Sequence, residues 1–474
     1  MDGAINDRSI SNYRGAAVDS ASLCERSCYE NLGVEQKMAS EIKVEIIHKE
    51  TIKPSSPTPH HLANSKLSIF DQITPEIYVP LLLFYPSNKS DDEFDHHSLF
   101  SERSHLLKTS LSEALTHFYA FAGEFEYNIS ISCNDHGAGF IESQVSCPIS
   151  KVLEKPDFGI LKQLIPTAIE SKQAEAGHLL LVQVNLFECG GLTIGVSISH
   201  KVADASTLST FIKSWAAIAL GLASTTDRVL LPTEFGVAST LFPPQDFFNS
   251  SQPTVEFAIE NCVTKRIVFD ASKIAALKSK ATSDTVPNPT RVEAVSALIW
   301  KCAMQASRSN LGYIKPSVWC QVVNMRTRSG LSLTENILGN FVWYFAATTI
   351  ESELDFKSLV AKFRKGIEEY KEKYPNGVTG EDAFQFIKES GNLLAKDHVE
   401  TYSCSSWCRF PFYEANFGWG KPSWVSIRSI EFKNTIMLMD MSDGVGIEAC
   451  LTFKEEDMVL IESNEDLLAY ASLV

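Results

Sequence analysis

From about residue 41 onward, short strand-like runs and amphipathic helical stretches follow one another in two blocks, and this pattern constrains the fold more than any other feature. Between Gly221 and about Gln252, Pro, Ser and Thr interrupt every apolar period, which indicates a crossover between the blocks. Neither block shows regular strand–helix–strand alternation, so the pattern predicts two mixed α/β halves. We expect an N-terminal half at 41–220, a crossover at 221–260 and a C-terminal half at 261–474.

Several elements can be placed by their period and their flanking residues. Asn134–Gly137 is a turn sequence that predicts a hairpin between strands 129–133 and 140–145. Gly444–Ala449 matches the dinucleotide pattern G-x-G-x-x-A, but period-two apolar residues continue to 453, so we predict a hairpin turn and a strand instead of a cofactor loop. Other expected strands are 43–47, 78–85, 178–188, 192–199, 266–269, 317–323, 341–348, 424–430 and 435–439, and expected helices lie near 107–118, 208–219, 270–277, 290–300, 353–373 and 381–396.

The composition is that of a globular chain with a large acidic excess. Of 474 residues 44% are apolar, and the formal net charge is −16. This charge repels polyanions, so we expect neither nucleic acid nor an anionic membrane as a partner. No apolar run approaches the ~20 residues of a membrane span, and no signal-peptide core precedes residue 40. We expect a cytoplasmic protein with a disordered segment at 1–40, in which Met38 is an alternative start.

The spacing of Cys and His does not indicate a metal site. The eleven cysteines contain no Cys-x-x-Cys pair, and no pair is followed by a histidine at ligand spacing. We predict reduced thiols that pack as small apolar residues. The paired histidines at 60–61 and 96–97 lie in polar stretches and are predicted to be solvated, so no metal is expected.

The segment Ser199–Asp204 carries the strongest chemical signal. A predicted strand ends at His200, and a predicted helix begins directly after Asp204, so both residues lie at a strand–helix junction that substrates can reach. An imidazole that titrates near pH 6.5 can accept a proton at neutral pH. Asp204 fits two interpretations, an ordinary helix N-cap or a residue that orients the histidine loop.

A second segment, Asn416-Phe417-Gly418-Trp419-Gly420, places two glycines around a tryptophan. Glycines allow close backbone approach around a large packed ring. Neither Asn nor Trp transfers protons, so we predict a structural anchor.

In this order and spacing, the two segments resemble the plant BAHD acyltransferase family, with His-x-x-x-Asp in mid-chain and Asp-Phe-Gly-Trp-Gly near the carboxyl end. The resemblance covers about residues 41–474 and includes the stretch at 52–59 and Ser406–Arg409. Within the family, the chain is most similar to the branch of vinorine synthase and other alkaloid O-acetyltransferases.

The resemblance implies an α/β fold with two chloramphenicol-acetyltransferase-like mixed-sheet halves and a solvent channel at their interface. His200 would be the general base in that channel, and Asp204 would hold its loop. The Trp407 indole N–H and the Ser405 hydroxyl are implied as oxyanion donors. The implied co-substrate is an acyl-CoA, by branch acetyl-CoA, and the implied acceptor is a hydroxyl of a plant specialised metabolite.

Two departures from the family pattern affect these expectations. Asn416 stands where the family has Asp, and we expect this loss of charge to leave Arg291 poorly compensated. The stretch Tyr119–Glu124 also differs from the usual Tyr-Pro-Leu-Ala-Gly-Arg, in a segment that borders the channel in relatives. These departures leave open a catalytically impaired relative that binds a small molecule or a protein, and a donor with a bulkier aromatic acyl group is a further alternative.

The phosphates of CoA require cations or N–H groups at the mouth of the channel. We predict Lys265, Arg266, Arg326 and Arg328 as the suppliers, in a monomeric enzyme without a permanently bound cofactor.

Overall fold

The computed structural model describes residues 42–87, 95–166, 177–221, 235–245, 261–326, 336–350, 355–375, 377–385, 399–427 and 432–474. Segment 1–40, Arg328 and most of the predicted crossover therefore lie outside the described residues. Val44–Val474 form one unit, separate from Met1–Lys43. Both predicted α/β halves belong to that unit, and their exact boundaries stay predictions.

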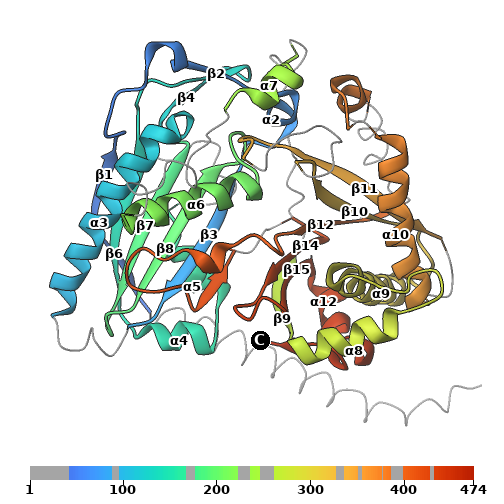
Figure 1. Ribbon diagram of the computed structural model, residues 1–474. Helices are drawn as coiled ribbons and strands as arrows, with labels where there is room; N and C mark the ends of the chain where they lie inside the picture. The colour runs from blue at the N-terminus through green and yellow to red at the C-terminus, as the bar shows by residue number, and fades with distance from the viewer. Residues whose placement is uncertain are drawn as a thin grey trace, which may run out of the picture. The chain divides into compact units, whose positions relative to one another are not determined.

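The first sheet has six strands in the order β1-β6-β7-β8-β3-β13 (Figure 1). Among its neighbouring strands only β6 and β7 run parallel. Every residue of β3, β7 and β8 is buried, because both faces of this sheet centre are covered. The polar residues Gln183, Asn185 and Thr193 on these strands are buried as well, and they are joined by hydrogen bonds. The strands are β1 (Val44–Ile52), β3 (Tyr78–Tyr85), β6 (Ala138–Val145), β7 (Leu180–Phe187), β8 (Leu192–Ser199) and β13 (Trp424–Ser426).

The second sheet has seven strands in the order β11-β10-β12-β14-β15-β9-β16. β12 runs parallel to both β10 and β14, so the carboxyl ends of these three strands lie at one edge. The other neighbours are antiparallel, including the predicted hairpin of β14 and β15. The strands are β9 (Cys262–Phe269), β10 (Ser317–Asn324), β11 (Val342–Thr349), β12 (Glu400–Ser406), β14 (Thr435–Asp440), β15 (Ile447–Lys454) and β16 (Ser472–Leu473).

Helices cover the sheets. In the first half, α3 and α6 pack against each other and cover one face of the six-stranded sheet (Figure 1). In the second half, α9 packs against α8, α10 and α12. The helices are α2 (Ile69–Ile73), α3 (His96–His117), α4 (Ile149–Glu154), α5 (Phe158–Gln163), α6 (Ala205–Ala219), α7 (Val237–Leu241), α8 (Ala271–Ala281), α9 (Arg291–Leu311), α10 (Phe356–Lys373), α12 (Glu455–Glu462) and α13 (Glu465–Leu468), with 3-10 turns η1 (His60–Leu62), η3 (Tyr119–Ala122) and η7 (Phe412–Glu414).

The two faces of the seven-stranded sheet belong to different cores. On β14, Ile436 and Leu438 join the core of the second half, beneath α8, α9 and α10. The alternate residues Met437 and Met439 join the core of the first half, together with Trp407. Successive side chains of a strand point to opposite faces, so this division shows that one face of the second sheet packs toward the first half.

A segment of the second half also completes the first sheet. β13 pairs antiparallel with β3, with Trp424 opposite Phe84. The rings of these two residues lie 4.7 Å apart between centroids. The chain thus returns to the N-terminal sheet after the Asn416–Gly420 segment, so the two halves share one sheet.

The predicted hairpin at Asn134–Gly137 is wrong, although the turn exists. Asp135 and Gly137 have φ of 55° and 105°, as turn residues do. The strands on either side belong to different sheets, because β5 (Ser130–Ser132) pairs with β2 (Asn64–Lys66) and β4 (Glu124–Glu126) in a three-stranded sheet. The turn therefore connects two layers.

The cap predictions are confirmed. Asp204, Asp270 and Thr290 are the N-caps of α6, α8 and α9, and Thr290 forms a capping box with Glu293. The described cysteines are free thiols. Among the described helices, none combines the length and the apolar character that crossing a membrane requires.

Candidate active site

His200 follows the last residue of β8, and its backbone N–H donates to Ile77 O over 2.8 Å. Its neighbours Ser199 and Lys201 are buried, whereas His200 is partly exposed. The strand therefore delivers the imidazole to its end, as the sequence predicts. Burial lowers the pKa of His200 below the ordinary 6.5, and the charge of Asp204 and the hydrogen bond with Asn340 only oppose this shift.

The hydrogen bonds of Asn340 determine which nitrogen of His200 carries the proton. Asn340 Nδ2 donates to Asp71 Oδ1 over 3.0 Å and to His200 O over 2.5 Å, and both of these atoms are acceptors. Asn340 Oδ1 therefore faces His200 Nδ1, 3.1 Å away. Because that oxygen can only accept, Nδ1 carries the hydrogen and Nε2 keeps a free lone pair.

Asp204 pairs with Arg326 in the buried interior. Arg326 Nη1 lies 2.7 Å from Asp204 Oδ2, and Nη2 lies 3.2 Å from Oδ1. The same carboxylate accepts the backbone N–H of Thr207 over 2.8 Å and that of Phe341 over 3.0 Å. Burial alone would raise the pKa of Asp204, but the Arg326 guanidinium and these donors hold it below its usual value. Asp204 is thus both the helix cap and a lock on the histidine loop.

The structure contradicts the prediction that Arg326 contacts CoA phosphates. Only 2% of Arg326 is exposed, and its remaining N–H groups donate to Ile337 O, Gly339 O and Thr207 Oγ1. The sequence places Arg326 just after a strand, as a cation at a channel mouth would be, but this strand end lies inside the protein.

Arg266 is also engaged inside the protein. It pairs with Glu448 over 2.8 Å, and its guanidinium lies 4.9 Å from the centre of the Trp424 ring. This pairing is incompatible with the predicted phosphate contact, because both charges are nearly enclosed. Lys265 is partly exposed and pairs with Glu462 over 3.2 Å, so it stays a candidate. Arg328 lies outside the described residues.

Ser405 and Trp407 lie at the carboxyl end of β12. Ser405 is partly exposed, and Trp407 is buried in the core shared with the first half. The Trp407 backbone N–H donates to Leu438 O over 2.7 Å. β10 runs parallel to β12 and leads into Arg326, the partner of Asp204, so one sheet edge carries both oxyanion candidates and the lock on the histidine loop. In open α/β sheets, ligands bind beyond such strand ends.

The segment Asn416–Gly420 is a structural anchor. Phe417 is fully buried, with its ring 4.8 Å from the centre of Trp215, and Trp419 stacks on Phe417. Asn416 Oδ1 accepts the backbone N–H groups of Gly418 and Gly420, each over 3.0 Å. Gly418 and Gly420 have φ of 120° and 108°, which explains why glycine stands there.

The expected gap around Arg291 is filled by a different acid. Arg291 Nη2 lies 2.8 Å from Asp440 Oδ1, and Nη1 donates to the carbonyls of Gly444 and Val445. The prediction that Asn416 leaves Arg291 uncompensated is therefore wrong. The sequence does not indicate Asp440 as this partner, because it lies at the end of β14, far from residue 291 in the chain.

The second departure, Tyr119–Glu124, falls on η3 and the start of β4. Ala120 and Phe121 are fully buried, and Phe121 packs against Phe118 and Phe211. Glu124 is partly exposed and accepts a hydrogen bond from Asn134. The unusual residues Ala120 and Phe121 therefore serve core packing.

Asp71 and Asn340 are site residues that the sequence analysis missed. Ser68-Ile69-Phe70-Asp71 matches the capping-box pattern, and Ser68 and Asp71 do form that box at the start of α2. Asn340 directly precedes the predicted strand 341–348. A sequence signal existed for the box, but none indicated that it contacts the histidine loop.

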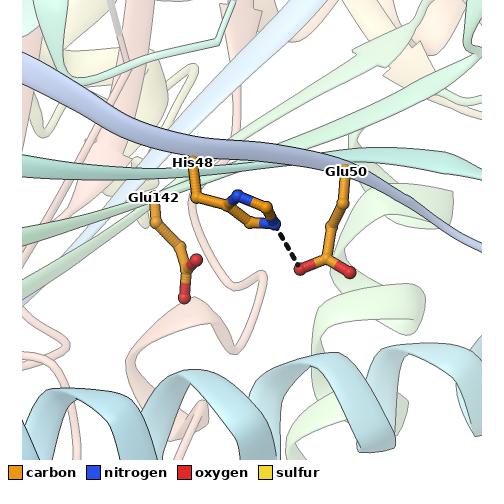
Figure 2. A group of neighbouring side chains, drawn as sticks. All are labelled: His48, Glu50 and Glu142. Atoms are coloured by element: carbon orange, nitrogen blue, oxygen red, sulfur yellow. Dashed lines mark ion pairs between the residues drawn. The ribbon is translucent and has the colours of Figure 1, made fainter.

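Among the residues that the structure describes, one group of side chains outside this site has ligand-like spacing, namely His48, Glu50 and Glu142 (Figure 2). Lys108 Nζ already lies 2.7 Å from Glu50 Oε1 and 3.0 Å from Glu142 Oε1. The ammonium therefore compensates these carboxylates, and the group is best described as a surface ion-pair network.

Two mixed sheets share a core, and a histidine is held at a strand–helix junction beside it. A model of the Transferase family matches residues 42–468, and the chain belongs to this family. The BAHD acyltransferase BIA1 of Arabidopsis thaliana is 37% identical over 91% of this chain and 98% of its own length. The chain is accordingly an enzyme of the BAHD acyltransferase type.

Other relatives span nearly the whole chain. Akuammiline synthase 1 of Alstonia scholaris is 39% identical over 90% of this chain and 97% of its own. Epi-neemfruitin B 7-O-acetyltransferase of Melia azedarach is 37% identical over 90% and 98%. Among solved structures, vinorine synthase superposes with a TM-score of 0.78 at 34% identity, covering 91% of this chain and 99% of its own. The TRI101 protein of F. sporotrichioides, complexed with coenzyme A and T-2, shares the fold with a TM-score of 0.66 at 17% identity, over 86% and 99%.

The contacts of Asn416 and Asp440 predict opposite outcomes for two substitutions. Asn416→Asp keeps the oxygen that accepts two N–H groups, so the melting temperature should change by less than about 2 °C. Asp440→Asn removes the charge that pairs with Arg291 and should destabilise the protein by about 1–3 kcal/mol. Thermal unfolding of both variants checks this, and a clear rise in stability for Asn416→Asp would contradict the assignment.

The pairing of Asp204 with Arg326 predicts a large loss of stability when one partner is removed. Asp204→Ala leaves a guanidinium buried without its anion, which should lower the unfolding free energy by about 3–5 kcal/mol. The double variant Asp204→Ala/Arg326→Met leaves no unpaired charge and should be more stable than Asp204→Ala alone. Denaturant titration of the wild type and both variants measures the unfolding free energies. Equal stability of the two variants would contradict the prediction that an unpaired Arg326 destabilises the protein.

Proposed function

We propose that the protein is an acyl-CoA-dependent O-acyltransferase that transfers acetyl from acetyl-CoA to a hydroxyl of a plant specialised metabolite. The observation that carries this proposal is the state of His200, whose Nδ1 is bound by Asn340 while Nε2 has no hydrogen-bond partner among the described residues. A neutral imidazole with a free Nε2, at a partly exposed strand end, has the form that a general base requires.

In the proposed mechanism, His200 Nε2 accepts the hydroxyl proton as the acceptor oxygen attacks the thioester carbonyl. An alcohol is too weak an acid to ionise at neutral pH, so bond formation and proton transfer proceed together. The tetrahedral intermediate then expels the CoA sulfur, the C–S bond breaks, and the His200 imidazolium returns the proton to that sulfur. The products are the ester and free CoA, and no covalent acyl-enzyme forms.

The oxyanion of the intermediate requires a donor. We propose the Trp407 indole N–H and the Ser405 hydroxyl, in the solvent channel expected between the two sheets. Their position at the carboxyl end of β12, beside β10, supports this role. Lys265 is the remaining described candidate for a phosphate contact.

The names of the relatives support the acceptor class and the donor. The related 7-O-acetyltransferase of Melia azedarach acts on a hydroxyl by its name and is 37% identical, and akuammiline synthase 1 and vinorine synthase are 39% and 34% identical. We therefore propose a polycyclic alkaloid or limonoid-like alcohol as acceptor, acetyl as the acyl group, and a cytoplasmic monomer as the working form.

Release of free CoA thiol from acetyl-CoA, in the presence of a panel of such alcohols, tests the proposal. We expect release by the wild type and a loss of at least about a hundredfold in His200→Ala, because general-base catalysis contributes about 10²–10⁴-fold. Phenylalanyl-type and cinnamoyl-type CoA donors serve as comparison. Release that His200→Ala retains, or none with any donor and acceptor, would contradict the proposal.

The lowered pKa of His200 sets the pH dependence of the reaction. The base form is lost only when the pH falls through this pKa, so the acid limb of kcat/KM should have its midpoint below 6.5. Above that midpoint the rate should stay level through neutral pH. A pH series of initial rates measures the limb, and a midpoint at or above 6.5 would show that His200 is not the titrating base in this environment.

A further inference from the structure

Asp71, on the short helix α2, is a buried carboxylate, and one residue, Asn340, connects it to His200 by hydrogen bonds. Its Oδ2 accepts Ser68 N over 2.8 Å and Ser68 Oγ over 2.7 Å. Its Oδ1 accepts Asn340 N over 2.7 Å and Asn340 Nδ2 over 3.0 Å. All four partners are donors, so both oxygens act as acceptors, as in an ionised carboxylate.

These bonds give the contacts of Asn340 a fixed direction. The Asn340 amide donates toward Asp71 through Nδ2 and accepts from His200 through Oδ1. If the amide turned over, its NH₂ group would face His200 Nδ1, and the ring would then have to carry its hydrogen on Nε2. That tautomer has no lone pair on Nε2 and cannot accept a proton from an alcohol there.

We propose that Asp71 and Asn340 are positioning residues that hold His200 in the tautomer with a free Nε2. This inference rests on the proposed function, in which His200 is the general base. The carboxylate that is connected to the base by hydrogen bonds through Asn340 therefore comes from the capping box of α2, and not from the fourth residue of His-x-x-x-Asp. The motif suggests a His–Asp pair, but Asp204 is bound to Arg326.

The charges around the chain Asp71–Asn340–His200 agree with this assignment. Arg326 neutralises Asp204, which faces the histidine loop from the start of α6. Lys201 is buried beside Asp71 and donates to Gln72 O and Asn128 Oδ1, and burial lowers its pKa to about 8, against the opposing charges of Glu76 and Asp71. No described cation hydrogen-bonds to Asp71, and its Oδ1 instead accepts both the backbone N–H and the amide of Asn340.

Asp71→Asn tests the proposal, with Glu293→Gln as the matched control. Both carboxylates lie at position N3 of a capping box. Glu293 hydrogen-bonds with Thr290 and Arg364, and not with the histidine loop. We expect Asp71→Asn to lower kcat by at least about tenfold while the KM for acetyl-CoA changes less than about twofold. Both substitutions should lower the melting temperature, because each weakens a capping box. Glu293→Gln should nevertheless keep kcat within about twofold of wild type.

A second measurement does not depend on the folding of a variant. With ¹⁵N-labelled histidine, NMR distinguishes a protonated from an unprotonated ring nitrogen, and the signals of His200 are those absent in His200→Ala. We expect the Nδ1–H tautomer in the wild type at neutral pH. An Nε2–H tautomer would overturn the inference, as would equal kcat in Asp71→Asn and Glu293→Gln. If activity proves independent of His200, the proposed function fails; if it depends on His200 but not on Asp71, only this inference fails.

Discussion

The buried ion pair between Asp204 and Arg326 is the interaction on which the rest of the site depends. Asp204 begins α6 in the first half, and Arg326 follows β10 in the second. Isolated charges in the interior are costly, but here hydrogen bonds from Thr207 and Phe341 also satisfy the carboxylate. The pair thereby joins the histidine loop to the other half of the enzyme.

Arg326 also places the segment that contacts His200. Its guanidinium donates to the carbonyls of Ile337 and Gly339, directly before Asn340. Asp71 then binds Asn340 from the other side through its backbone N–H and its amide. Two aspartates from distant parts of the chain thus hold one loop, and the direction of each hydrogen bond follows from what its atoms can donate or accept. The direct hydrogen bond of the imidazole is with Asn340 of this loop, and Asp204 acts on the loop through Arg326 and Phe341.

Local features of the fold were predictable from the sequence. The strands 78–85 and 192–199 match β3 and β8 residue for residue. The first is an apolar run of strand length and the second alternates apolar with small or polar residues, and both signals act within a few residues. The caps at Asp204 and Thr290 were equally clear, since a cap depends on residues within one turn. The hairpin at Asn134–Gly137 failed because a turn sequence does not determine which sheet the next strand joins.

The sequence by itself determined that the chain has two α/β halves, that His200 lies at the end of a strand, and that the family is that of the BAHD acyltransferases. Only the tertiary structure decided the partners of the charged residues. Arg291 binds Asp440, Arg266 binds Glu448, and Arg326 binds Asp204, each more than a hundred residues away in the chain. Such pairings depend on how sheets and loops meet in space, and neither period nor propensity, which act over a few residues, carries that information.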